Sequence, residues 1–208
     1  MVQGADGILL THSSRSENNS FVFKRVSKPF YELSQRLATE FAGTRRLRMH
    51  TDCNQEQGIL VYPYFRGTLL GLIQKDAELP FPERKKILRQ VGEAIHELHS
   101  KDWIHIGNVP ASNEIPFSAT SPTRTILIFL TDVKPDNILV NWTCDSDGLK
   151  TVTDVALGDF DIAFKSEGGK PWQKPYAIGN AMWRSPEGQT GRGVTKASDM
   201  YSFGLVVG

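Results

Sequence analysis

The stretch TDVKPDNILV, residues 131–140, carries three side chains whose types and spacing suit phosphoryl transfer. This reaction needs a carboxylate that orients the acceptor hydroxyl, a cation beside the transferred phosphate and oxygen ligands for Mg²⁺. We assign these roles to Asp132, Lys134 and Asn137 in that order. Farther along the chain, Asp159 in the sequence GDFD offers a second hard oxygen ligand suited to Mg²⁺. The pattern therefore predicts a magnesium-dependent phosphoryl-transfer site.

Two later motifs follow in order, WRSPE (183–187) and SDMYSFG (198–204). With them, the chain resembles a eukaryotic-type protein kinase domain, and in overall style it is similar to kinase-like proteins of filamentous fungi. DVKPDNILV resembles the catalytic loop, DFD (159–161) stands where that family has Asp-Phe-Gly, and GNAMWRSPE resembles the end of the activation segment. The resemblance gives Glu187 and Asp199 structural roles around the activation segment and the following helix. It implies ATP and Mg²⁺ as cofactors and a protein hydroxyl as acceptor, with Ser/Thr favoured over Tyr.

The resemblance extends to the N-terminal part, where FVFK is similar to the strand that carries the lysine for the ATP phosphates. That lysine is Lys24. Gly4 and Gly7 of GADG then fall at the register of the phosphate-covering glycine loop, although an ordinary turn explains them equally simply. Lys24 needs a carboxylate from the following helix, and we favour Glu40 over Glu32 because of its separation from Lys24.

The segment LVYPYF resembles the hinge that receives adenine. Pro63 has no N–H but keeps its carbonyl, so we assign the backbone donor to Phe65. Tyr62 would gate the pocket behind the hinge. An aromatic edge strand is the alternative for Tyr62 and Tyr64.

Hydrophobic periodicity predicts the elements that position these residues. Short alternating runs indicate two hairpins before residue 66, with a helix over 30–41 between them. A long amphipathic helix starts at Pro82, and ILVNWT, DSDG and VALGDF read as strand, turn and strand. The sequence therefore predicts an α+β chain in two lobes, and the resemblance implies a bilobal, kinase-like fold. The N-lobe would span 1–66 with an incomplete first strand, and an incomplete, mainly helical C-lobe would span 67–208.

Residues 107–131 interrupt this pattern with a Pro-, Ser- and Thr-rich stretch that ends in ILIFL. Removing them joins HSKDWIHI to DVKPDN, which is how the loop of the resembled family is written. Two explanations stay open. The segment is either an unspliced intron that has been translated, since codons for Gly-Asn and Thr-Asp can contain splice signals, or a true insertion. A translated insertion costs little loop-closure entropy if its ends stay close. His105 would then still pack near Asp132.

Four departures from the family pattern leave other functions open. Ile106 replaces an arginine of the loop, Asp161 replaces a flexible glycine, and Asn180 replaces a threonine. The chain also stops at Gly208, within an apolar helix whose residues FGLVV we expect to face water. The alternatives are a pseudokinase-like nucleotide-binding or scaffolding module, or an inactive fragment of a mis-spliced gene model.

Bulk composition excludes several classes of function. The 208 residues carry a net charge of +1 with 39% hydrophobic residues, as in ordinary globular proteins, so no nucleic-acid partner is expected. No apolar run reaches the length of a membrane span, and no signal peptide opens the chain. We therefore expect no membrane association, two free cysteines and a cytoplasmic or nuclear location. The protein substrate and the oligomeric state are open.

Overall fold

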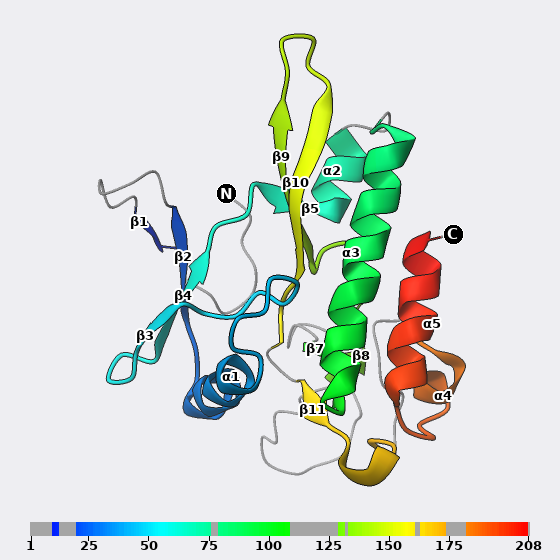
Figure 1. Ribbon diagram of the computed structural model, residues 1–208. Coiled ribbons are helices and arrows are strands. Elements are labelled where there is room, and N and C mark those ends of the chain that lie inside the picture. Colours follow the sequence, from blue (N-terminus) through cyan, green and yellow to red (C-terminus); the bar gives the residue numbers. More distant parts are fainter. Residues whose placement is uncertain are drawn as a thin grey trace, which may run out of the picture.

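A computed structural model describes residues 10–12, 20–75, 79–108, 129–131, 133–160, 163–173 and 182–207 (Figure 1). The chain is a mixed α+β structure, which confirms the predicted fold class at this level. Among the described residues, four antiparallel sheets of two to four strands are combined with α-helices that lie between residues 28 and 100 and again between residues 186 and 207.

The first sheet has the strand order β1-β2-β4-β3, with β1 (Leu10–His12), β2 (Phe21–Arg25), β3 (Asp52–Asn54) and β4 (Ile59–Pro63) all antiparallel. Both predicted hairpins are thus confirmed. Helix α1 (Lys28–Glu40) follows β2 and has a proline in its first turn, where the missing N–H costs nothing. It buries Leu37 completely, and Phe41 at its end is equally buried.

The second sheet pairs β5 (Gly67–Thr68) with β9 (Ile138–Cys144), and β9 with β10 (Lys150–Leu157). The predicted turn between β9 and β10 is present, with the Asp145 carboxylate accepting bonds from the amides of Asp147 and Leu149. Helix α2 (Leu69–Lys75) precedes the long α3 (Phe81–Ser100), which packs along β10 (Figure 1). The predicted apolar face of α3 is confirmed, because five of its residues are buried: Ile87, Val91, Ala94, Ile95 and Leu98.

The 107–131 segment is closed by its own two ends. Strand β7 (Ile106–Asn108) pairs antiparallel with β8 (Phe129–Thr131), so Ile106 lies opposite Thr131. The two ends of the segment are therefore neighbours, as the loop-entropy argument requires. Sequence periodicity predicted no strand there, because three residues are too few to show an alternation.

The remaining elements surround the end of α3. Strand β6 (Trp103–Ile104) pairs with β11 (Phe164–Lys165), which the short 3₁₀ helix Glu167–Gly169 follows. Helix α4 (Pro186–Gln189) precedes α5 (Lys196–Val207), which runs beside α3 (Figure 1). On α5, Phe203 and Val206 pack against the core, whereas Leu205 and Val207 are 40% and 52% exposed. The expected exposure of this apolar helix is thus confirmed in part.

Within the described residues, no helix is long and apolar enough to cross a bilayer, and no cluster of three or more His, Cys, Asp or Glu side chains is arranged around a metal position. Cys53 and Cys144 are exposed free thiols, as predicted.

Candidate nucleotide site

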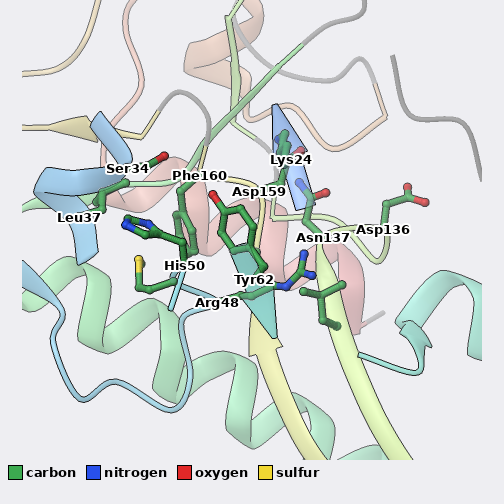
Figure 2. A pocket seen from close by; sticks show the side chains of 13 residues that line it. Lys24, Ser34, Leu37, Arg48, His50, Tyr62, Asp136, Asn137, Asp159 and Phe160 are labelled. Atoms are coloured by element: carbon green, nitrogen blue, oxygen red, sulfur yellow. The ribbon is translucent and has the colours of Figure 1, made fainter. Parts of the chain in front are cut away.

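One cavity of about 240 Å³ is lined by residues from six separate stretches of the chain (Figure 2). The first sheet contributes Lys24 from β2 and Tyr62 from β4. Helix α1 contributes Ser34 and Leu37. The rest of the lining includes Arg48, Asn137, Leu139, Gly158, Asp159 and Phe160. Three residues that the sequence singled out, Lys24, Asn137 and Asp159, are therefore brought together although they lie far apart in the chain.

A cation and a carboxylate face each other across this cavity. The Lys24 ammonium lies 3.4 Å from Oδ1 of Asp159, and the two side chains are 30% and 37% exposed. The Asp159 backbone has a φ of 62°, in the left-handed region that few non-glycine residues adopt. Such a conformation costs of order 1–3 kcal/mol and persists where surrounding contacts enforce it, typically at functional sites.

Asn137 is held directly beside the Asp159 segment. The Gly158 amide donates to the Asn137 carbonyl at 2.9 Å, and the Asn137 amide donates to the Lys134 carbonyl at 3.0 Å. These backbone bonds fix the residue before Asp159 against the turn that carries Asn137, so two oxygen-bearing side chains line the same cavity. Lys134 is half-buried and does not line it. The predicted Asp132, Gly4 and Gly7, as well as Asp161 and Asn180, lie outside the described residues.

Behind the cavity, His105 connects the Asp159 segment to helix α5. Its Nε2 lies 2.9 Å from the Gly158 carbonyl, its backbone amide donates to Oδ2 of Asp199 at 2.9 Å, and its ring meets the Phe160 ring edge-on at 5.0 Å. The same Asp199 oxygen lies 2.8 Å from Nε2 of His99. Asp199 is completely buried, and this burial raises the pKa of its carboxyl. Asp199 therefore joins α5 to His99 of α3 and to His105, which directly follows β6.

Comparison with known proteins gives this geometry a context. No family model matches the chain. It is 25% identical to the serine/threonine-protein kinase PknA of Corynebacterium glutamicum over 158 residues, 76% of the chain. It is 26% identical over 142 residues, 68% of the chain, to a probable serine/threonine-protein kinase of Dictyostelium discoideum. With a probable L-type lectin-domain containing receptor kinase of Arabidopsis thaliana it shares 26% identity over 216 aligned residues, 98% of the chain.

The chain is a distant homologue of Ser/Thr protein kinases. It spans 25%, 6% and 28% of the lengths of these three relatives, so it corresponds to a part of each. The kinase-like character predicted from the sequence is thereby supported over most of the chain.

In this kinase-like domain, Glu40 does not pair with Lys24, and that prediction is wrong. The Glu40 carboxylate accepts from Nζ of Lys165 at 2.8 Å, from Nε1 of Trp103 at 2.7 Å and from Nε of Arg36 at 3.2 Å. Glu32, the alternative, lies 3.9 Å from Lys28 on the exposed side of α1. Along the stripe of α1 that faces the cavity, Ser34 and Leu37 line it, and Glu40 lies one turn too far.

These contacts lower the pKa of Glu40 to about 2, first through the hydrogen bond from Lys165 and then through that from Trp103. Because the folded-state pKa is depressed, the stabilisation is present above the ordinary pKa near 4.5 and is lost as the pH falls toward 2. The carboxylate is 24% exposed. After solvent screening we expect it to contribute roughly 1 kcal/mol.

We therefore expect Glu40→Gln to flatten the acid limb of the stability profile. Between about pH 5 and about pH 3, the free energy of unfolding of the variant should fall by roughly 1 kcal/mol less than that of the wild type. Urea denaturation at stepwise pH measures this. Glu32→Gln, which alters a carboxylate that is 65% exposed, is the matched control and should follow the wild type. If the free energy of unfolding fell equally with pH in all three proteins, the stabilising role given to the ionised Glu40 carboxylate would be contradicted.

The predicted hinge has an arginine on it. Nε and Nη2 of Arg48 both donate to the Pro63 carbonyl, at 3.1 and 2.9 Å, and the guanidinium lies 5.0 Å over the Tyr62 ring. Tyr62 lines the cavity, and the Phe65 amide has no hydrogen-bond partner within the described part of the chain. The Pro63 carbonyl, however, is already used by a side chain that the sequence analysis did not single out.

The charged run RRLR (45–48) is typical of solvated surface, an expectation that is wrong for two of its arginines. Arg46 bonds Glu93, Gln90 and Asp154, linking the first part of the chain to α3 and β10. Arg48 is partly buried, and burial lowers the pKa of its guanidinium. Only the tertiary fold shows that this run lies between β10, where the Arg48 amide donates to the Leu157 carbonyl, and Pro63 of β4.

Glu187 has a partner within the chain. Its carboxylate accepts a hydrogen bond from the Ser198 hydroxyl at the start of α5. Burial alone would raise its pKa, but the hydrogen bonds from Ser198 and from neighbouring groups outweigh it and hold the pKa below the ordinary value. Glu187 therefore ties α4 to α5, which accords with the structural role predicted for it.

Proposed function

We propose that this domain transfers the γ-phosphate of a nucleoside triphosphate, with ATP as the expected donor, to a protein hydroxyl. The observation that carries the proposal is the convergence of Lys24, Asn137 and Asp159 on one cavity, together with the distant kinase homology. A Ser or Thr acceptor accords with the names of the Corynebacterium and Dictyostelium relatives. The division into an N-lobe of 1–66 and a C-lobe of 67–208, and a cytoplasmic location, belong to the same proposal.

In this mechanism, each residue has a separate task. Lys24 contacts the α- and β-phosphates and reduces their negative charge. Asn137 and Asp159 supply an amide oxygen and a carboxylate for Mg²⁺, a donor set that suits this ion because it also takes ligands from phosphates and water. The bound Mg²⁺ would neutralise charge that develops on the phosphates. Asp132 orients the acceptor hydroxyl and takes its proton, and Lys134 steadies the transferred group.

A second candidate function is a pseudokinase-like module that binds nucleotide, or a partner, without turnover. Two observations favour it. The carboxylate of α1 that was expected at Lys24 is bound to Lys165 and Trp103, and the Pro63 carbonyl is covered by Arg48. Both features alter the nucleotide site while leaving the Lys24–Asp159 pair in place.

Nucleotide binding is tested by thermal unfolding with Mg²⁺ and either ATP or GTP. A ligand at about 100 times its Kd adds about 2.7 kcal/mol, which corresponds to a rise in Tm of roughly 5–10 °C for a chain of this size. We expect this rise in the wild type and its loss in Asp159→Ala. Asp147→Ala, which removes an exposed carboxylate from the β9–β10 turn, should keep it. A wild type that responds to neither nucleotide would contradict the proposal.

Turnover separates the two candidate functions. Labelled phosphate should appear on a Ser- and Thr-rich acceptor protein such as casein, and Asp132→Asn should abolish this transfer while leaving the nucleotide-dependent rise in Tm. Binding without any transfer would favour the pseudokinase-like module.

A further inference from the structure

Arg48 changes the hydrogen-bonding character of the cavity at the predicted hinge. A guanidinium carries five N–H donors in a fixed plane. One donor on Nε and one on Nη2 are used by the Pro63 carbonyl, at 3.1 and 2.9 Å. Pro63 itself has no N–H, so its carbonyl is the group that this residue could offer a ligand, and that oxygen already accepts two bonds.

The remaining donors of Arg48 are available on the cavity side. Nη1 has no hydrogen-bond partner among the described residues, and Nη2 keeps a second N–H that runs parallel to one on Nη1. Figure 2 shows the guanidinium beside the Tyr62 ring and reaching toward Asn137, among the residues that line the cavity. The stack on Tyr62 at 5.0 Å and the bonds to Pro63 hold the plane of the group in place.

A pair of parallel donors selects between the two purines at the six-position. Guanine presents two acceptors side by side, O6 and N7, and arginine binds them with two parallel hydrogen bonds. Adenine presents an amino donor at the same position, which would face the donors of Arg48. Its amino group also needs an acceptor, and the Pro63 carbonyl is occupied.

We infer that Arg48 makes this cavity a guanine-nucleotide site, with O6 and N7 of the base on the guanidinium and the phosphates toward Lys24. The inference rests on the proposed function, because it keeps a nucleoside triphosphate as the phosphate donor, but it replaces the expected ATP with GTP. Lys24 and Asp159 lie together in the cavity, and Arg48 lies near enough to Asp159 for that carboxylate to act on its charge, so the base and the phosphates would occupy neighbouring parts of one cavity (Figure 2).

The test measures Kd for Mg²⁺ complexes of GTP, ATP, inosine triphosphate and 7-deaza-GTP by titration calorimetry on the whole chain. A bidentate base contact discriminates by about 5- to 100-fold. We expect the wild type to bind GTP and inosine triphosphate alike, since both carry O6 and N7. It should bind ATP at least about fivefold more weakly, and 7-deaza-GTP more weakly than GTP by a similar factor.

Arg48→Met keeps an unbranched stem that reaches as far as the position of Nε and removes all the donors of the guanidinium. It should weaken GTP binding, abolish the difference between GTP and 7-deaza-GTP and strengthen ATP binding, because the Pro63 carbonyl becomes free for the amino group of adenine. Arg48→Lys keeps the charge without the parallel donors and should also lose the preference, which separates base recognition from simple charge. Arg45→Met, an exposed neighbour, is the control and should match the wild type.

Each outcome of these titrations supports or overturns the inference. A wild type that binds ATP as tightly as GTP, or an Arg48→Met variant that keeps the full preference for GTP, overturns the inference and leaves the proposed kinase function standing. Binding of neither nucleotide by a wild type with native circular dichroism overturns both. Should Arg48→Met fail to fold, the comparison of GTP with 7-deaza-GTP on the wild type still decides, since equal affinities exclude a contact to N7.

Discussion

Replacing Asp199 with alanine should lower the free energy of unfolding by roughly 3–5 kcal/mol, the cost of removing one partner from a buried charged network. Oδ2 of Asp199 accepts from the His105 amide and contacts Nε2 of His99, so two partners lose their contact with α5 at once. Nothing else among the described residues replaces that oxygen. The buried His105 amide would be left without an acceptor, a further cost of about 1–3 kcal/mol if no water enters.

Urea denaturation of the variant, with the slope m as a check on two-state behaviour, measures this loss. Asp199→Asn keeps an acceptor for the His105 amide and should lose about half as much stability as the alanine variant. Met200→Ala alters the next residue of α5, which is 50% exposed, and should change the free energy by less than about 0.5 kcal/mol. A loss below about 1 kcal/mol in Asp199→Ala would show that the network carries little of the stability.

The effect of Asp199 should also reach the candidate site. His105 links Asp199, which its backbone amide contacts, to the Gly158 carbonyl, which its ring Nε2 contacts. Gly158 immediately precedes Asp159. Because Asp159 holds an unfavourable backbone conformation, with φ at 62°, it depends on such support from its neighbours. We therefore expect Asp199→Asn, which folds better than the alanine variant, to show a weakened Mg²⁺-nucleotide response as well.

Sequence reasoning was most successful where chemistry and local pattern coincide. Asn137 follows a tight turn and precedes β9, and Asp159 follows β10, so the β9–β10 hairpin itself returns the two residues to the same place. Helix α3 was predicted with its buried face because 20 residues give five repeats of the apolar pattern. Local rules were sufficient in both cases.

Sequence reasoning failed where the position of a side chain depends on how two elements that are distant in the sequence are placed against each other. Glu40 shares a stripe of α1 with Ser34 and Leu37, but six residues along a helix displace a side chain by about 9 Å. That displacement carries Glu40 past the cavity to Lys165 and Trp103. Similarly, Arg48 reaches the Pro63 carbonyl of β4 only because its own backbone is bonded to Leu157 of β10, and a run of arginines carries no local sign of this path.

The two wrong predictions, for Glu40 and for the Pro63 carbonyl, concern the same cavity. In the place where the resemblance put a glutamate and an open carbonyl, the folded chain has Ser34 and a capped carbonyl. Lys24 nevertheless keeps a carboxylate within 3.4 Å, that of Asp159. The phosphate end of the cavity thus retains the expected charges, while its other end and the flank formed by α1 differ from the expectation.

Lys24→Met should consequently reduce phosphate transfer by about 10²–10³-fold, the usual loss when one preorganised charge that stabilises the transition state is removed. Stability should scarcely change. The Lys24–Asp159 pair is about one-third exposed on each side, and such pairs contribute about 0–1 kcal/mol. Initial rates of labelled-phosphate transfer with saturating Mg²⁺ and either GTP or ATP, beside urea denaturation of the same samples, separate the two effects.

Lys28→Met removes an 86% exposed lysine three residues beyond the same strand and should leave the rate unchanged. A variant at Lys24 that unfolds more easily by several kcal/mol, or transfers phosphate at the wild-type rate, would show that the pair serves the fold and not the reaction.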